Sequence, residues 1–174
     1  MRTRIALLLG GLVALSLPAT AQEPHRSGCE QPEYRQFDFW LGDWDVLTPD
    51  GSKAGTNRIE RILNGCALLE NWTSTRGGAG KSLNFYNPAG KRWEQAWVAD
   101  SGWIVKYEGE FKDGAMRFEG ESIQRDGSSV RSRMTLTPLA GGLVRQLIEQ
   151  SKDGGATWST GFDATYVRRA ASSP

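Results

Sequence analysis

Residues 37–46 read FDFWLGDWDV, and they open a long series of short strand-like runs. A Gly-x-Trp pattern, Gly42 and Trp44, lies inside this first run. Turn signals rich in Gly, Asn and Asp follow at near-even spacing to the end of the chain. Short strands separated by regular turns are typical of an up-and-down β-barrel that closes on itself. The sequence therefore predicts an all-β, antiparallel barrel, and barrels of this kind are commonly containers.

Nine turn signals divide the chain into ten expected strands. They lie at residues 49–51, 64–65, 76–80, 87–90, 100–102, 113–114, 126–127, 140–142 and 153–155. Intervals of about 11–15 residues are too short for a crossover helix, so neighbouring strands should be antiparallel. The only helix expected is a short one within residues 32–40, capping one end of the barrel. We place the barrel domain at residues 37–169, after a leader at 22–36 and before a frayed tail at 170–174.

The start of the chain resembles a secretory signal peptide. Arg2 and Arg4 provide a positive first segment, and residues 5–17 are apolar. A small-x-small cleavage pattern ends at Ala21. We therefore predict a signal peptide at residues 1–21 and a soluble periplasmic or secreted product with no membrane span. The formal net charge is +1 and no basic cluster is present, so nucleic acid is not an expected partner.

The chain has two cysteines, Cys29 and Cys66. An exported protein enters an oxidising compartment, and an even cysteine count favours one Cys29–Cys66 disulfide over two free thiols. Such a bond would tie the leader to the barrel. A catalytic thiol is not expected, because the single histidine, His25, lies beside Cys29 in the leader. The presence of a single histidine also argues against a His-rich metal site in the barrel.

Alternation along the strands assigns aromatic and aliphatic side chains to the interior and charged ones to solvent. Ten strands enclose more space than side chains fill, and no long helix is present to plug it. We therefore predict a ligand pocket with apolar walls and a few polar groups. Its expected ligand-binding residues are Glu70, Trp72, Gln95, Trp97, Tyr107, Gln146 and Tyr166. Asn84 would join them if the Ser82 face of its strand turns inward.

The Gly42-x-Trp44 pattern on the first strand, with Arg168 on the last, resembles the calycin-like barrels: lipocalins, fatty-acid-binding proteins and nitrobindins. In those families the first-strand Trp packs at the closed end of the barrel and a last-strand Arg lies across it. A longer series of segments resembles an uncharacterised family of exported bacterial lipocalin-like proteins. These segments are residues 37–42, 64–66, 82–86, 93–98, 144–146 and 151–158. The resemblance implies a lipocalin-like barrel and no established activity.

The comparison with nitrobindins also bears on cofactors. Those barrels bind haem through a histidine inside the barrel, whereas His25 lies outside the strands expected here. We therefore expect no haem and no other cofactor.

Glu70 is the best candidate for acid–base chemistry, since it lies on a strand face that is otherwise apolar. Burial there would raise its pKa. The more common arrangement for such a residue is an ion pair with an arginine at the barrel rim, and we favour it for Glu70.

Two further motifs have a structural and a functional interpretation. Arg131, Arg133, Arg145 and Glu149 lie on neighbouring strands and favour an outward ladder of charges. If they face inward instead, Arg133 and Arg145 would bind an anionic head group. Residues 151–158, SKDGGATW, resemble the Asp-box of sialidase propellers. The motif occurs once here, and we interpret it as a well-capped hairpin.

The leading functional hypothesis is a non-enzymatic exported barrel that binds a small apolar or amphipathic molecule. One alternative is an isomerase or hydrolase that uses Glu70. Another is a protein-interaction barrel whose interior is filled by side chains. The sequence specifies neither the ligand nor the oligomeric state.

Overall fold

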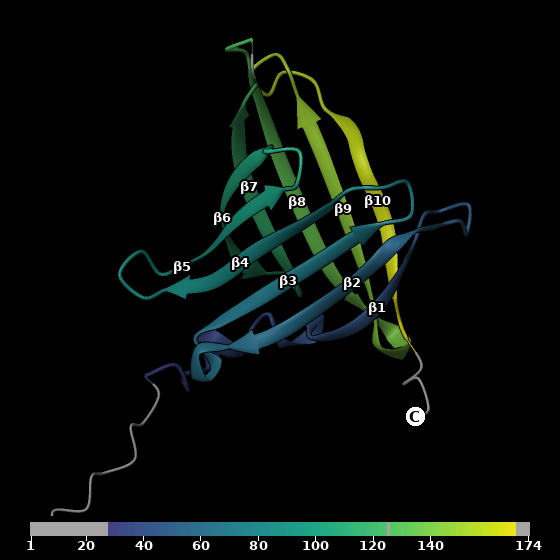
Figure 1. Cartoon of the computed structure of the whole chain (residues 1–174). Helices are drawn as coiled ribbons and strands as arrows, with labels where there is room; N and C mark the ends of the chain where they lie inside the picture. The colour runs from purple at the N-terminus through teal and green to yellow at the C-terminus, as the bar shows by residue number, and fades with distance from the viewer. Residues whose placement is uncertain (1–27, 125, 170–174) are drawn as a thin grey trace, which may run out of the picture.

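The structure is a computed structural model that describes residues 28–124 and 126–169, and its strands form one closed barrel (Figure 1). Consecutive strands pair antiparallel, and β1 (Gly42–Leu47) pairs with β10 (Ser159–Arg168) to close the sheet. The strands between them are β2 (Lys53–Ile62), β3 (Ala67–Ser74), β4 (Ala79–Asn87), β5 (Arg92–Ala99), β6 (Ile104–Lys112), β7 (Ala115–Ile123), β8 (Ser129–Leu139) and β9 (Leu143–Ser151). The predicted antiparallel up-and-down barrel is confirmed, with ten strands.

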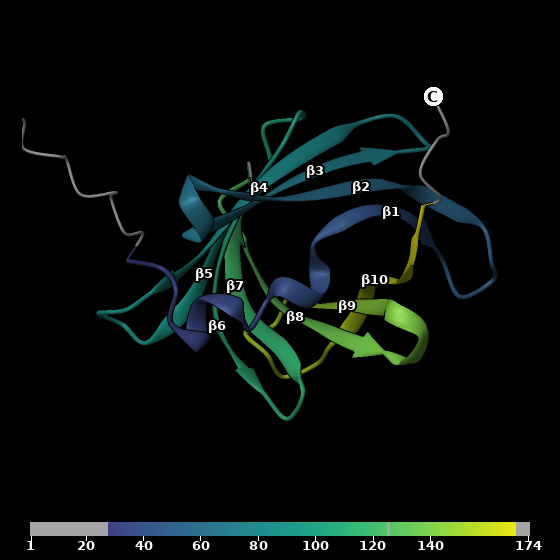
Figure 2. The same cartoon turned by 90° about the horizontal axis from the view of Figure 1, so that it is seen from below.

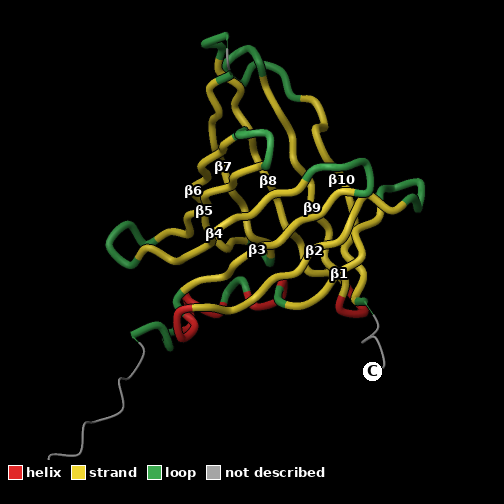
Figure 3. Tube along the Cα trace, in the orientation of Figure 1, coloured by secondary structure: helices red, strands yellow, loops and turns green. Residues whose placement is uncertain are grey.

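The connections between strands lie alternately at the two ends of the barrel (Figure 3). Each of the nine predicted turn signals falls in one of these connections or at its edge. Two connections at the same end contain short 3-10 helices, η3 (Leu63–Gly65) and η4 (Ala140–Gly142). At the opposite end, the connections are turns and loops as far as the structure describes them, and we refer to this end as the open end.

The N-terminal segment covers the other end, the closed end, as the view from below shows (Figure 2). It contains two 3-10 helices, η1 (Pro32–Arg35) and η2 (Asp38–Trp40), where the sequence predicts one short helix. The split occurs because Phe37, between them, has a φ of −102° and a ψ of 7°. Phe37 is fully buried: its ring stacks on that of Trp40 at 4.9 Å and meets the edge of Trp93 at 5.5 Å. These rings fill the closed end, so the segment within residues 32–40 caps one end of the barrel as predicted.

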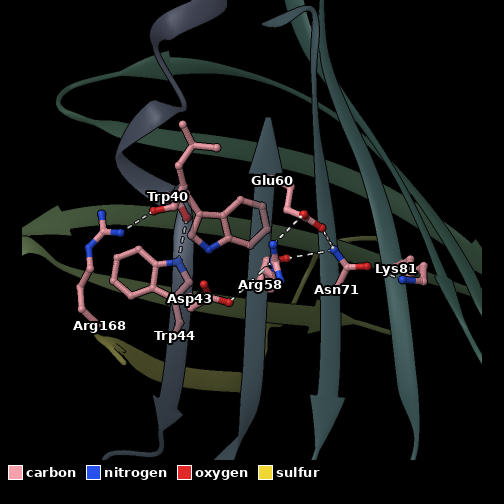
Figure 4. Close-up of polar contacts among 9 residues, drawn as sticks. Trp40, Asp43, Trp44, Arg58, Glu60, Asn71, Lys81 and Arg168 are labelled. Atoms are coloured by element: carbon pink, nitrogen blue, oxygen red, sulfur yellow. Dashed lines mark hydrogen bonds and ion pairs between the residues drawn. The ribbon is translucent and has the colours of Figure 1, made fainter. Parts of the chain in front are cut away.

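Trp44 and Arg168 join the first strand to the last at the closed end (Figure 4). The Arg168 guanidinium lies 4.1 Å from the centre of the Trp44 ring and donates a 2.7 Å hydrogen bond to the carbonyl of Leu41. Trp44 Nε1 donates to the carbonyl of Trp40 at 2.8 Å. Gly42 has a φ of +127°, and a Cβ atom on it would lie 2.1 Å from Arg168 Nη1. The Gly-x-Trp pattern therefore makes room for the stack that the resemblance implies.

A disulfide joins Cys29 to Cys66, with 5.0 Å between the Cα atoms, so the predicted pairing is confirmed. It anchors the N-terminal segment beside η3 at the closed end. The predicted signal peptide, its cleavage near Ala21, His25 and the tail at 170–174 lie outside the described residues. Within the described residues, no helix has the length and apolarity needed to cross a membrane.

The hydrophobic core occupies the part of the barrel next to the closed end. Phe37 contacts Phe118 as well as Trp93, and both Trp40 and Trp44 contact the ring of Tyr166. Other fully buried members of this core are Val46, Leu68, Met116, Leu136 and Val144. The interior is therefore closely packed at one end, which leaves the open end as the place for a cavity.

Candidate functional site

A cavity of about 310 Å³ lies inside the barrel toward the open end. Its outermost lining residues stand beside the open-end turns. Trp103 directly precedes β6 and is 37% exposed, while Gln150 and Phe162 stand near the β9–β10 connection. The deepest part reaches Tyr166, whose ring also contacts the closed-end core. The cavity is thus open to solvent at one side and floored by the core at the other.

All seven residues that the sequence assigns to the pocket line this cavity. They are Glu70, Trp72, Gln95, Trp97, Tyr107, Gln146 and Tyr166. Six further lining residues were not in that set: Trp103, Met134, Ile148, Gln150, Gly161 and Phe162. The alternation that selects Gln146 also selects Ile148 and Gln150 on the same strand, so the signal for these two was present. The structure gives the position of each residue, and ligand binding by them stays a prediction.

Strand register brings the polar members of the site together. Glu70 of β3 pairs with Ser82 of β4, and Asn84 of β4 pairs with Gln95 of β5. Ser82 and Asn84 are both buried, so the Ser82 face of β4 turns inward. Asn84 therefore lies inside the barrel, although it stands behind Gln95 and does not line the cavity itself.

Two tryptophans of the cavity wall pack against glycines of a neighbouring strand. A Cβ atom on Gly80 would lie 2.3 Å from Cζ2 of Trp97. One on Gly55 would lie 2.6 Å from Cη2 of Trp72. Any larger residue at these positions would push the indole away from the sheet and into the interior. The glycines therefore help to keep the cavity open.

Glu70 is 5% exposed and accepts two hydrogen bonds. Asn57 Nδ2 donates to Oε1 at 2.7 Å, and Ser82 Oγ donates to Oε2 at 2.6 Å. No lysine or arginine within the described residues forms a salt bridge with it. The favoured expectation, a rim glutamate paired with an arginine, is therefore wrong, because the strand register places Glu70 in the interior between polar neutral groups.

Glu70 is the centre of a chain of buried polar residues, which we term the polar belt. Tyr166 Oη accepts from Asn57 Nδ2 at 3.2 Å and donates to Gln146 Oε1 at 2.7 Å. On the other side of Glu70, the Ser82 hydroxyl accepts from Asn84 Nδ2 at 2.8 Å, and Asn84 Oδ1 accepts from Gln95 at 2.6 Å. The members of the belt are Asn57, Glu70, Ser82, Asn84, Gln95, Gln146 and Tyr166. The belt crosses from β9 through β10, β2, β3 and β4 to β5.

Asn57 is a member of the polar belt that the sequence pattern did not identify. It lies on β2 between Gly55 and Ile59, on the inward face, and is 2% exposed. The alternation of β2 could have placed it inside. Its link to Glu70 depends on how β2 and β3 pair, which the sequence pattern does not display.

Burial raises the pKa of Glu70 to about 7, although the hydrogen bonds from Ser82 and Asn57 oppose this effect. Burial also raises the pKa of Tyr107 and of Tyr166, and the negative charge of Glu70 adds to both shifts. The two phenols are therefore neutral at physiological pH. Glu70 is the one group of the cavity wall that changes its charge near neutrality.

The arginine ladder faces solvent. Arg133 forms two hydrogen bonds with Glu149, at 2.7 and 2.9 Å, and Arg145 forms two with Asp163, at 2.9 and 2.7 Å. Both arginines are exposed on the outer surface, as the favoured interpretation predicts. An anionic head group therefore finds neither of them in the interior.

The SKDGGATW segment is a capped hairpin, as predicted. Asp153 accepts hydrogen bonds from the backbone N–H and the hydroxyl of Thr157, and these bonds lower its pKa. Trp158 Nε1 donates to the carbonyl of Gly155, and the Arg133 guanidinium lies 4.3 Å from the centre of its ring. The motif therefore stabilises the β9–β10 connection on the outside of the barrel.

Within the described part of the chain, no group of three or more His, Cys, Asp or Glu side chains is placed to hold a metal ion. Comparison with known proteins does not assign a function to the cavity. No family model matches this chain. No similar protein is found among curated sequences. The structure establishes a closed antiparallel barrel of ten strands with buried polar residues, and its function has to be argued from the cavity.

Proposed function

We propose that this protein is an exported barrel that binds a small apolar or amphipathic molecule in its open-end cavity. The observation that carries the proposal is the combination of an open cavity of about 310 Å³, aromatic walls and the polar belt at its base. Small-molecule sites have this composition: mostly apolar walls with a few polar groups that set the orientation of the ligand.

The size of the cavity limits the ligand. Pockets for drug-sized molecules span roughly 300–1,000 Å³, so 310 Å³ lies at the lower bound. Trp72, Trp97 and Phe162 supply ring surfaces on different strands of the wall. A flat or chain-like molecule fits such a space, and a longer chain would extend past Trp103 at the mouth.

The disulfide supports export. Disulfides persist in oxidising compartments such as the periplasm or the extracellular space, and Cys29–Cys66 is of the structural kind that ties a terminal segment to a domain. Together with the signal-like start of the chain, this supports a periplasmic or secreted location.

Quenching of tryptophan fluorescence by a panel of apolar and amphipathic probes tests the binding function. Trp97→Ala removes a wall residue and should weaken binding of a probe about tenfold or more, since burying an aromatic side chain against a ligand contributes about 1.5–3 kcal/mol. The matched control is Trp158→Ala, which removes an indole from the outer hairpin and should leave affinity unchanged. If no probe binds, and native mass spectrometry of protein from its own host shows no bound molecule, the binding function is excluded.

A second candidate function, acid–base catalysis by Glu70, is favoured by one observation. The pKa of Glu70 is raised to about 7, and the side chain lines a cavity that is open to solvent, which suits a general base at neutral pH. Catalysis predicts that a bound carbonyl compound exchanges its acidic C–H protons for deuterium. NMR would detect this exchange, and Glu70→Gln would stop it while the compound still binds. A binding protein shows no exchange in either form.

The filled-interior alternative describes only the closed-end half of the barrel. There buried aromatic and aliphatic side chains pack together, whereas the open-end half contains the cavity described above.

A further inference from the structure

The charge of the residues that line the cavity limits which molecules can bind there. The lining residues include one carboxyl group, Glu70, and no lysine, arginine or histidine. The two tyrosines among them are neutral at physiological pH because their pKa values are raised. The wall therefore carries either one negative charge or none, and never a positive one.

The polar belt has hydrogen-bond acceptors to spare beside Glu70. An ionised carboxylate has about four acceptor positions, and the described residues fill two of those on Glu70. Asn57, which donates to Glu70, leaves its own Oδ1 without a partner. A buried carboxylate without a cation is costly, and so is a buried acceptor without a donor. Of these two groups Glu70 lines the cavity, so a ligand that brings donors and a positive charge would satisfy its carboxylate.

The aromatic wall suits the same kind of ligand. Trp72, Trp97, Trp103, Tyr107, Phe162 and Tyr166 surround the space that Glu70 faces. Aromatic rings attract cations, most strongly where water is excluded, and a carboxylate among aromatic rings provides a charged partner as well. Apolar parts of a ligand pack against the same rings.

An anionic amphiphile finds no cationic side chain in the cavity wall. Arg133 and Arg145 are on the outer face and are each paired with a carboxylate, Glu149 and Asp163 respectively. A fatty-acid carboxylate in the cavity would therefore meet Glu70 rather than a guanidinium, and two ionised carboxylates close together repel each other.

Building on the proposed function, we infer that the molecule bound in the cavity is an organic cation: an amine with an aromatic or apolar body, whose ammonium group donates to Glu70. The body of the amine packs between the indole rings, and the ammonium group lies at the polar belt.

The affinity of the cavity for an amine should depend on pH in a defined direction. The ionised carboxylate is the form that binds ammonium, so affinity falls as the pH is lowered through about 7, where Glu70 takes up a proton. The titratable groups that face Glu70 from other strands are Tyr107 on β6 and Tyr166 on β10, and both stay neutral in this range. The neighbours on β2 and β4, Asn57 and Ser82, do not titrate.

The test compares three probes that share a phenyl group and a two-carbon chain: phenethylamine, phenethyl alcohol and phenylacetate. Isothermal titration at pH 8 should give the amine at least about a tenfold tighter dissociation constant than the alcohol, because a charge-assisted hydrogen bond is stronger than a neutral one. Phenylacetate should bind weakest. The affinity of the amine should fall between pH 8 and pH 6.

Glu70→Gln keeps the size of the side chain and removes its charge. It should reduce amine affinity about tenfold, leave alcohol affinity within about twofold, and abolish the pH dependence. The matched control is Glu119→Gln, which removes a charge from the outer face and should change none of these values. Equal binding of amine and alcohol, or unchanged amine affinity in Glu70→Gln, would overturn the cation inference and leave the container function intact. If none of the three probes binds, the cation inference also fails, and the broader probe panel decides separately on the container function.

Discussion

Glu70 shows how a single residue depends on its surroundings. Its carboxylate accepts hydrogen bonds from Asn57 and Ser82, and no described cation lies beside it. The sequence identifies it as an ionisable side chain on an apolar strand face. Its two hydrogen-bond partners lie on the strands on either side of β3, and both are neutral. The negative charge of the ionised Glu70 carboxylate is therefore poorly compensated.

The pH dependence of stability follows from the raised pKa of Glu70. The carboxyl has a pKa of about 7 in the folded state against 4.5 in the unfolded chain, so the folded state binds more protons between these values. Stability contributed by Glu70 is therefore present at low pH and is lost as the pH rises through this window, by about 3 kcal/mol in all.

Urea unfolding of the wild type and of Glu70→Gln between pH 5 and pH 8 measures this effect. The free energy of unfolding of the wild type should fall relative to that of the variant as the pH rises. Glu119→Gln, on the outer face, should follow the wild type. If the free energies of unfolding of the wild type and Glu70→Gln change in parallel with pH, the pKa of Glu70 is the same in the folded and unfolded states.

At the scale of elements, the contact between β4 and β5 shapes the cavity. Gly80 on β4 leaves the space that the Trp97 indole occupies, and a similar contact joins Gly55 to Trp72. Trp97 and Trp72 thus each depend on a glycine of another strand. The sequence displays both residue types, but their contact follows from strand register.

Gly80→Val should therefore reduce the volume of the cavity, although Gly80 is not one of the residues that line it. The new side chain would displace Trp97 inward, weaken probe binding at least about tenfold, and cost about 1–3 kcal/mol in stability through overpacking. Ala79→Val, one residue earlier on the same strand and exposed, should affect neither quantity. Probe titrations and urea unfolding measure both. Unchanged binding in folded Gly80→Val would mean that Trp97 does not shape the cavity.

At the scale of the whole molecule, the barrel divides into two ends with different roles. The closed end holds the N-terminal helices, the Trp44–Arg168 stack and the disulfide. The open end holds the cavity mouth. Stability at one end and binding at the other should therefore be separable.

Replacing both cysteines, Cys29→Ser with Cys66→Ser, tests this separation. The bond spans 37 residues, and its loss should lower the free energy of unfolding by about 3–4 kcal/mol. Probe affinity at the open end should stay within about twofold of the wild type wherever the variant is folded. Reductant should destabilise the wild type and leave the double variant unaffected. Equal stability of the wild type with and without reductant would contradict a structural role for the bond.

The sequence by itself determined the strand count, the antiparallel order and the seven cavity residues, because turn chemistry and two-residue alternation are local properties of the chain. It also determined the Trp44–Arg168 stack, through a pattern shared with known barrels. Only the tertiary structure decided that Glu70 pairs with Asn57 and Ser82 instead of an arginine. That choice depends on which side chains meet across three strands, and register across a sheet is set by the packing of the whole barrel.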